Sequence, residues 1–183
     1  MRSYSKYFAL LLAVITLSII SVNAQDASDK RSGRTIEQSV RRQILKMPRY
    51  EVFDYIGYDV NGSTVTLYGK VYNAVNKSTA ENSVEDIPGV SRVINKIEVL
   101  PPSPFDDTIR RDLYGSISRT AGLSRYLWPV NPSVRLIVDR GRVTLEGYVS
   151  NKGDKNLMNI AANGVSNVFS VTNNLKVDSG KAG

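Results

Sequence analysis

The sequence Thr64-Val-Thr-Leu-Tyr-Gly-Lys-Val-Tyr-Asn73 occurs a second time, in modified form, as Arg142-Val-Thr-Leu-Glu-Gly-Tyr-Val-Ser-Asn151. Apolar and polar residues alternate in both copies, which is the pattern of a β-strand with one buried face. Continued without a gap to residues 100 and 178, a shift of 78 gives 11 identical pairs in 37 positions. About two identities are expected by chance. The chain therefore contains a duplicated unit.

Upstream of each copy lies an apolar stripe with a spacing of four residues, as one buried face of a helix requires. The stripes are Ile36, Val40 and Ile44 in the first unit, and Ile109, Leu113 and Ile117 in the second. Here the shift between the copies is 73 instead of 78. The second unit therefore holds five extra residues between its first helix and its first strand.

Turn signals and apolar patterns complete each unit. Asn61-Gly62 and Asp139-Arg140-Gly141 predict hairpins, and a second helix precedes a last strand at residues 93–99 and 171–177. We predict an α+β protein of two tandem αββαβ modules. Each module is expected to be a small three-stranded mixed sheet with two helices on one face. The other sheet face is then left open or used for contact.

Glycine and asparagine recur at matching positions. Gly69 and Gly147 lie inside the alternating strands, where glycine permits a bulge or a close backbone approach. Asn73 and Asn151 follow these strands and suit helix N-caps. We interpret these four residues as structural.

A second asparagine pair, Asn95 and Asn173, falls in phase with the inward valines of the last strands. A buried amide needs hydrogen-bond partners. It either binds a ligand or satisfies neighbouring backbone groups. We favour the backbone interpretation, because duplicated structural residues persist more easily than duplicated sites.

The repeated strand and the segment Pro88-Gly-Val-Ser-Arg-Val-Ile-Asn-Lys-Ile-Glu-Val99 resemble the BON domain family. The closing segment of that family reads G-V-x-x-V-x-N, as Gly89 and Val90 begin it here; the second copy has Asn167 before Val168. The resemblance implies an αββαβ fold and a bacterial envelope setting. It also implies phospholipid binding and, for proteins with two such domains, osmotic-stress protection and outer-membrane integrity.

The first 24 residues are typical of an export signal, with Arg2 and Lys6 before an apolar run and cleavage expected before Gln25. No cysteine is present for lipidation or disulfides. We therefore expect a periplasmic or secreted protein. The predicted segments are a signal peptide (1–24), a flexible N-terminus (25–34), a first BON-like domain (35–100), a Pro-rich linker (101–105), a second BON-like domain (106–178) and a flexible C-terminus (179–183). The two domains are expected to fold separately, with few contacts across the linker.

The composition of the chain excludes several kinds of catalytic and metal site. The chain has no histidine and no cysteine, which excludes Ser-His-Asp triads, Cys-His pairs and His-based metal sites. We expect no catalytic residues, no metal and no cofactor. The net charge is +7, and removal of the signal leaves 22 basic and 17 acidic residues, or +5. A basic excess is typical of proteins that bind nucleic acid, an anionic membrane or an acidic polymer, and it also serves solubility alone; export argues against nucleic acid as the main partner. With the family resemblance, the expected partner is an anionic phospholipid or membrane surface, with an envelope protein as a further possibility.

The extra residues of the second unit fall within 118–132, where Arg119 and Arg125 flank Tyr126, Leu127 and Trp128, the only tryptophan. These five residues predict contact with a membrane interface, where aromatic rings and arginines are favoured. Alternatively, Leu127 and Trp128 fold back to cap a small core.

A rival hypothesis is a protein-interaction or chaperone-like module that uses the open sheet faces. Its residues would be Tyr68, Tyr72 and Tyr148, which project away from the helices.

Overall fold

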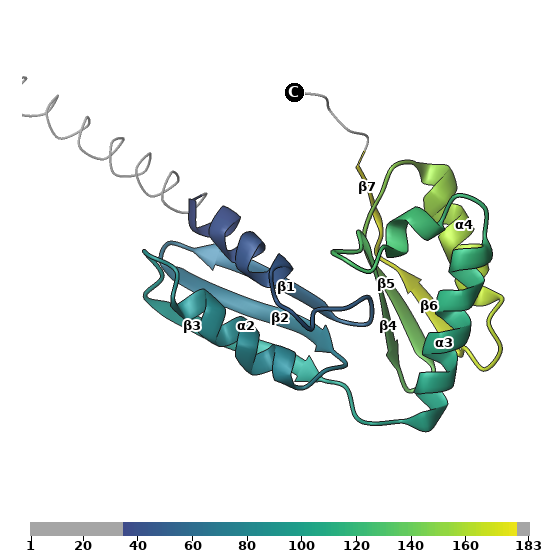
Figure 1. Ribbon diagram of the computed structural model, residues 1–183, viewed down its shortest axis with the longest axis horizontal. Helices are drawn as coiled ribbons and strands as arrows, with labels where there is room; N and C mark the ends of the chain where they lie inside the picture. Colours follow the sequence, from purple (N-terminus) through teal and green to yellow (C-terminus); the bar gives the residue numbers. More distant parts are fainter. Residues whose placement is uncertain (1–34, 179–183) are drawn as a thin grey trace, which may run out of the picture.

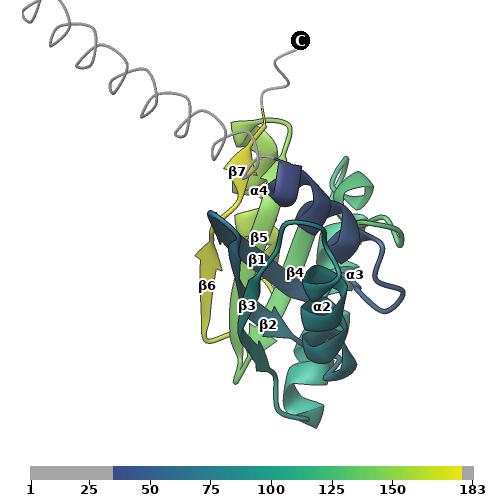
Figure 2. The same ribbon diagram turned by 90° about the vertical axis from the view of Figure 1, so that its left-hand side faces the viewer.

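A computed structural model describes residues 35–178, and the predicted signal peptide and both predicted flexible ends lie outside this range. Two modules lie side by side (Figure 1). Module 1, residues 35–100, has a helix at residues 35–45, β1 (Tyr55–Asn61), β2 (Thr64–Val71), α2 (Val75–Glu85) and β3 (Arg92–Val99). Its middle strand β2 pairs antiparallel with β1 and parallel with β3. Figure 2, with module 1 in front, shows the two helices along one side of this sheet.

Module 2, residues 104–178, repeats the plan. Its elements are α3 (Pro104–Arg119), the short 3₁₀ helix η1 (Ser124–Leu127), β4 (Val134–Asp139), β5 (Arg142–Val149), α4 (Lys152–Asn163), β6 (Ser170–Asn173) and β7 (Lys176–Val177). The strand β5 is central, antiparallel to β4 and parallel to β6 and β7. The predicted αββαβ order and mixed sheets are confirmed, except that the last strand of module 2 is split into β6 and β7.

Each module has its own apolar core between its helices and its sheet. The predicted helical stripes are buried in both: Ile36, Val40 and Ile44 against Val65 and Leu67, and Ile109, Leu113 and Ile117 against Val143 and Leu145. The two cores form separate clusters of buried residues. The duplicated sequence therefore specifies two separate packing solutions of the same kind.

Gly69 and Gly147 are required by a close approach of the neighbouring strand. Their φ angles are +118° and +112°, a region that favours glycine. A Cβ atom would lie 2.2 Å from the carbonyl oxygen of Tyr55 or 2.1 Å from that of Ser133. The sequence-based interpretation of this pair is confirmed.

Asn95 and Asn173 make the same backbone bonds in the two modules. Each amide donates to the carbonyl of a lysine on the second helix, at 3.0 Å. Each side-chain oxygen accepts from the N–H two residues further on. The amides hold the last strand to the helix, as the backbone interpretation predicts.

The other asparagine pair differs between the modules. Asn151 caps α4 by accepting from the N–H of Asp154 at 2.8 Å. Asn73 accepts instead from the N–H of Val75, just before the first full turn of α2, whose N-cap is Ala74. The predicted N-cap is therefore confirmed for Asn151 and wrong for Asn73.

The helix α3 begins at Pro104, inside the segment expected to be a linker. Its cap is Ser103, whose hydroxyl accepts from the N–H of Asp106. Asp106 itself is buried and accepts from the N–H groups of Arg140 and Gly141 at the β4–β5 turn. Proline suits the first helical position, because its fixed φ angle and missing N–H cost nothing there.

The expectation of few contacts between the modules is wrong. Connector 1, residues 46–54, joins the first helix of module 1 to β1 and lies against β4. Its Val52 carbonyl accepts from the N–H of Leu136 at 2.8 Å, and the Val52 and Phe53 side chains pack against the core of module 2. Connector 1 thereby covers the outer edge of β4, which would otherwise present unpaired backbone groups.

Candidate functional site

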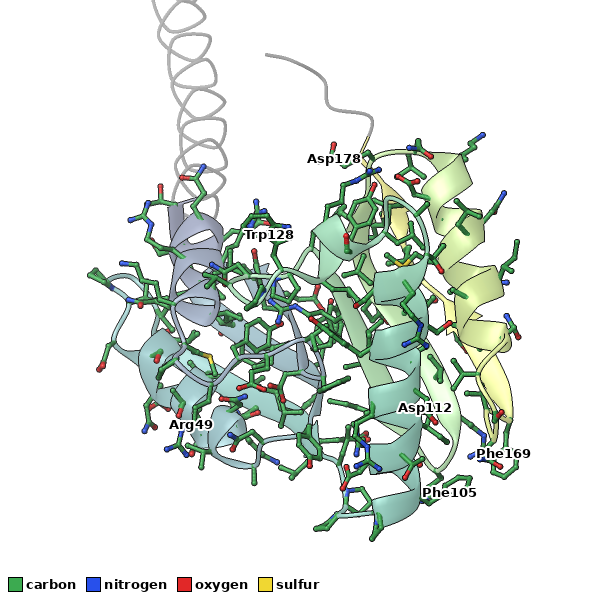
Figure 3. All side chains as sticks on the ribbon, turned by 45° about the vertical axis from the view of Figure 1, so that its right-hand side comes forward. Arg49, Phe105, Asp112, Trp128, Phe169 and Asp178 are labelled. Carbon is green, nitrogen blue, oxygen red and sulfur yellow. The ribbon has the colours of Figure 1, made fainter. Side chains whose placement is uncertain are left out.

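Connector 2, residues 120–133, is the counterpart of connector 1 and carries four of the five predicted membrane-contact residues, while Arg119 ends α3 just before it. The short helix η1 turns Leu123, Tyr126 and Leu127 into the core of module 2. Beyond it the side chain of Trp128 is 67% exposed and that of Val130 is 79% exposed. Each of the two alternatives for this loop therefore holds for one residue. Leu127 caps the core, whereas Trp128 projects from the surface (Figure 3).

A polar cluster fixes the base of this projection. The Tyr126 hydroxyl hydrogen-bonds to the Asp154 carboxylate and accepts from the N–H of Ser150 at 3.0 Å. The Arg125 guanidinium lies 2.5 Å from the same carboxylate and 4.7 Å from the centroid of the Tyr126 ring. We call residues 128–131 the tip; it follows directly from this anchored segment.

The two predicted arginines differ in availability. Half of the Arg125 side chain is exposed, and its charge is partly offset by Asp154. Arg119 is exposed at the end of α3, with its guanidinium folded back beside Gly115. Within residues 35–178 Arg119 forms no ion pair. Of the five predicted contact residues, the structure leaves Arg119, Arg125 and Trp128 at the surface and buries Tyr126 and Leu127.

Sequence reasoning missed Val130, the most exposed large apolar residue of the tip. Its signal is its place between Pro129 and Pro132, beside Asn131 at φ +51°. Proline and a left-handed residue keep this segment out of regular structure. Asp154, which anchors Arg125 and Tyr126, was also missed because it lies on α4, far away in sequence.

The sheet faces that bear the rival tyrosines are turned partly toward each other. Arg135 and Ile137, on the face of β4 away from the helices, are buried. Arg135 donates to the carbonyl of Glu51 at 2.8 Å and lies 3.9 Å from the centroid of the Tyr50 ring. Lys70 of β2 pairs with Asp139 of β4 at 2.5 Å.

Tyrosines line the same region. The Arg110 guanidinium covers the ring of Tyr72 at 4.5 Å, so this residue belongs to the contact between modules. Burial, with the nearby Glu146 carboxylate of module 2, raises the pKa of Tyr55 to about 12. Tyr68 and Tyr148 remain exposed. The open surface available to the rival hypothesis is smaller than two free sheet faces.

Residues 35–178 contain no group of three or more Asp, Glu, His or Cys residues placed to hold a metal ion. None of the helices in that range combines the length and the apolar character needed to cross a membrane.

The family model described as BON domain matches residues 32–101 and again residues 106–179. Among curated proteins, none matches. Two solved structures are similar at 12% identity, both of CdsD, a structural protein of the type III secretion system of Chlamydia trachomatis. One, its C-terminal domain, covers 76% of this chain and 96% of its own, with a TM-score of 0.31; for the other these values are 77%, 91% and 0.30.

Proposed function

The chain belongs to the BON domain family, and from that premise we propose that it is a non-enzymatic envelope protein that binds anionic phospholipid surfaces through the tip of module 2. BON domains are associated with phospholipid and with the envelope, and the family is generally non-enzymatic. BON domain proteins are typically periplasmic or otherwise located in the envelope. The finer assignment to lipid contact at Trp128 rests on the geometry of connector 2.

The observation that carries the proposal is the exposure of Trp128 and Val130 on a fixed base. Tryptophan favours the membrane interface, because its ring is apolar and its N–H still reaches polar groups. Two exposed apolar side chains of this size lower the solubility of the protein and do not contribute to its core. The bonds among Arg125, Tyr126 and Asp154 fix the segment directly before the tip, which reduces the ordering needed when the tip enters a bilayer.

Electrostatics supports an anionic surface. Within residues 35–178 the exposed Arg119 forms no ion pair, and the chain has an excess of basic residues. Each basic residue near an anionic leaflet adds roughly 1 kcal/mol of attraction. We infer that such binding supports envelope integrity or stress protection after export to the periplasm.

A second candidate function, protein interaction through the sheet faces, is favoured by one observation. Tyr148 and Tyr68 remain exposed although their sheets face each other. A partner that binds there would contact both modules at once. Substitution of Tyr148 by Ser separates this function from lipid binding, because the tip does not include it.

Co-sedimentation with vesicles tests the proposal. The mature chain should sediment with vesicles that contain phosphatidylglycerol and remain largely in solution with phosphatidylcholine alone. Trp128→Ser should weaken binding about tenfold or more, since it removes most of the inserted apolar area. The matched control is Ile160→Ser on α4, because Ile160 is 66% exposed and lies outside the tip. Equal loss in both variants, or no sedimentation of the parent chain, overturns the proposal.

A further inference from the structure

Module 2 carries a second exposed aromatic group, formed by Phe105 and Phe169. Their ring centroids are 6.1 Å apart, and the side chains are 45% and 74% exposed. Both rings lie over Gly141 of the β4–β5 turn, where an added Cβ would come within 2.6 Å of the Phe169 ring. Figure 3 shows the pair at one end of module 2 and Trp128 at the other.

The first repeat shows that the fold does not need these rings. Phe169 occupies the position of Ser91, and Gly141 that of Ser63, at the repeat shift of 78. The backbone bond between the two positions is kept, at 2.9 Å in module 1 and 2.8 Å in module 2. In module 1 the two serine hydroxyls lie 2.6 Å apart and hydrogen-bond to each other. An exposed phenylalanine therefore replaces a polar contact that closes the same turn.

The charge around the pair is basic. Arg140 and Arg142 are exposed at the same turn and form no ion pair within the described residues. The neighbouring acidic groups have partners: Asp106 accepts from two backbone N–H groups, Asp107 pairs with Arg110, and Asp139 pairs with Lys70. The turn therefore presents two apolar rings beside two exposed arginines, which interact with the Asp139 carboxylate at longer range than an ion pair.

An anionic bilayer fits this surface better than a protein does. A second copy that docked here in a symmetric way would bring four arginines together. A stable protein interface buries about 800 Å² on each partner, whereas two aromatic side chains supply roughly half of that area. A bilayer needs only a few inserted rings and nearby basic residues.

The aromatic pair and the tip lie at opposite ends of α3. The helix α3 runs from Phe105 to Arg119, and its 16 residues span roughly 24 Å. The aromatic pair and the tip are therefore separated by the length of the module. We propose that Phe105, Phe169, Arg140 and Arg142 form a second lipid-contacting surface, so that one chain joins two anionic bilayers. This inference rests on the proposed lipid binding at the tip.

Vesicle clustering tests the inference, and Trp128 emission reports the tip separately. The parent chain should raise the turbidity of phosphatidylglycerol-containing vesicles and shift Trp128 emission to the blue. The double variant Phe105→Ser, Phe169→Ser should cluster vesicles at least about tenfold less, while its emission shift is kept. The matched control, Leu157→Ser, changes an exposed apolar residue of α4 and should behave as the parent chain. If the double variant folds poorly, Arg140→Ser with Arg142→Ser should reduce clustering most at low salt.

The outcomes separate the two proposals. A parent chain that shifts its emission without clustering vesicles overturns the second surface and leaves the tip assignment standing. Clustering that persists in both the phenylalanine and the arginine variants also overturns it. Vesicle binding by Trp128→Ser that depends on Phe169 supports the second surface, even if the parent shows no emission shift and the tip assignment fails.

Discussion

Connector 1 and connector 2 join the first helix to the first strand of their modules, and they point their apolar residues in different directions. Connector 1 packs Val52 and Phe53 against module 2. Connector 2, longer by five residues, turns Leu127 into its own core and leaves Trp128 and Val130 outside. The shorter connector is therefore used to join the modules, and the longer one reaches the surface.

The two connectors also meet one structural demand with different chemistry. The N–H that follows the middle strand needs an acceptor, at Tyr72 in module 1 and at Ser150 in module 2. The buried carboxylate of Asp54 accepts it at 2.7 Å in module 1. The Tyr126 hydroxyl accepts it at 3.0 Å in module 2. Each acceptor is held by the same position of the second helix, Asn76 or Asp154.

This difference shows what a duplication leaves free to change. Strands, helical stripes and strand glycines are kept because packing fixes them. The connector has only to fill a gap and supply one acceptor. Within that limit module 1 uses it for the joint between modules, and module 2 extends it into solvent. The location of the proposed lipid contact follows from this freedom.

The largest effect is expected from Asp54→Ala. Asp54 accepts from the N–H groups of Glu51, Tyr72 and Asn73 and from the Asn76 amide. Its loss leaves the buried Asn76 amide without this acceptor, at about 1–3 kcal/mol, and removes the acceptor of three partly buried N–H groups as well. We expect the free energy of unfolding to fall by about 3–5 kcal/mol, measured by urea denaturation.

Asp54→Asn is the informative control, because it keeps one acceptor oxygen and should lose less stability than Asp54→Ala. If Asp54→Ala unfolds at the same urea concentration as the parent chain, connector 1 does not depend on this carboxylate. The Asp54 carboxylate and the Tyr126 hydroxyl would then not be equivalent acceptors in the two modules.

A smaller loss is expected from Tyr126→Phe in connector 2. The ring still fills the core, but the hydroxyl no longer accepts from Ser150 or bonds to Asp154. We expect a loss of about 1–2 kcal/mol in the free energy of unfolding. The tip should also become more mobile, which raises the quenching of Trp128 by aqueous iodide. A loss of stability as large as that of Asp54→Ala would mean that the two connectors contribute equally to the free energy of unfolding.

The smallest effect is expected at the Lys70–Asp139 pair, an ion pair between the two modules. The hydrogen bond from Lys70 lowers the pKa of Asp139 in the folded chain. A depressed carboxyl pKa contributes stability above the unfolded value of about 3.9, and this contribution is lost as pH falls through the folded pKa. The parent chain should exceed Asp139→Asn by up to about 1 kcal/mol at pH 6, and thermal melts should show the difference vanishing toward pH 3. A difference that grows at low pH contradicts this assignment.

Periodicity and repetition predicted the elements, because the apolar stripes and Gly69 and Gly147 are set by local packing that both copies share. Asn167 of module 2 occupies the position of Gly89 in module 1. Both residues have left-handed φ angles, +68° and +93°, and asparagine tolerates this conformation. The contact between modules could not be predicted. Val52 and Phe53 look like ordinary loop residues in sequence, and only the folded chain brings them to β4.

The sequence predicted only part of the candidate site, because the burial of its side chains depends on contacts with residues far away in the chain. Aromatic and basic residues in one insertion located connector 2, but composition could not say which side chains turn inward. That choice depends on η1 and on the bond between Tyr126 and Asp154, which joins residues 28 positions apart. Phe105 and Phe169 were missed because 64 positions separate them.

Emission from Trp128 measures the central claim most directly, because no other tryptophan contributes. On addition of phosphatidylglycerol vesicles, we expect a blue shift and protection from aqueous quenchers, both weaker in Arg119→Ser and weaker still at high salt. The same vesicles should raise the melting temperature of Trp128→Ser less than that of the parent chain. If the emission of the parent chain is unchanged by anionic vesicles and remains fully open to quenchers, Trp128 does not enter a bilayer and the lipid function assigned to the tip is wrong.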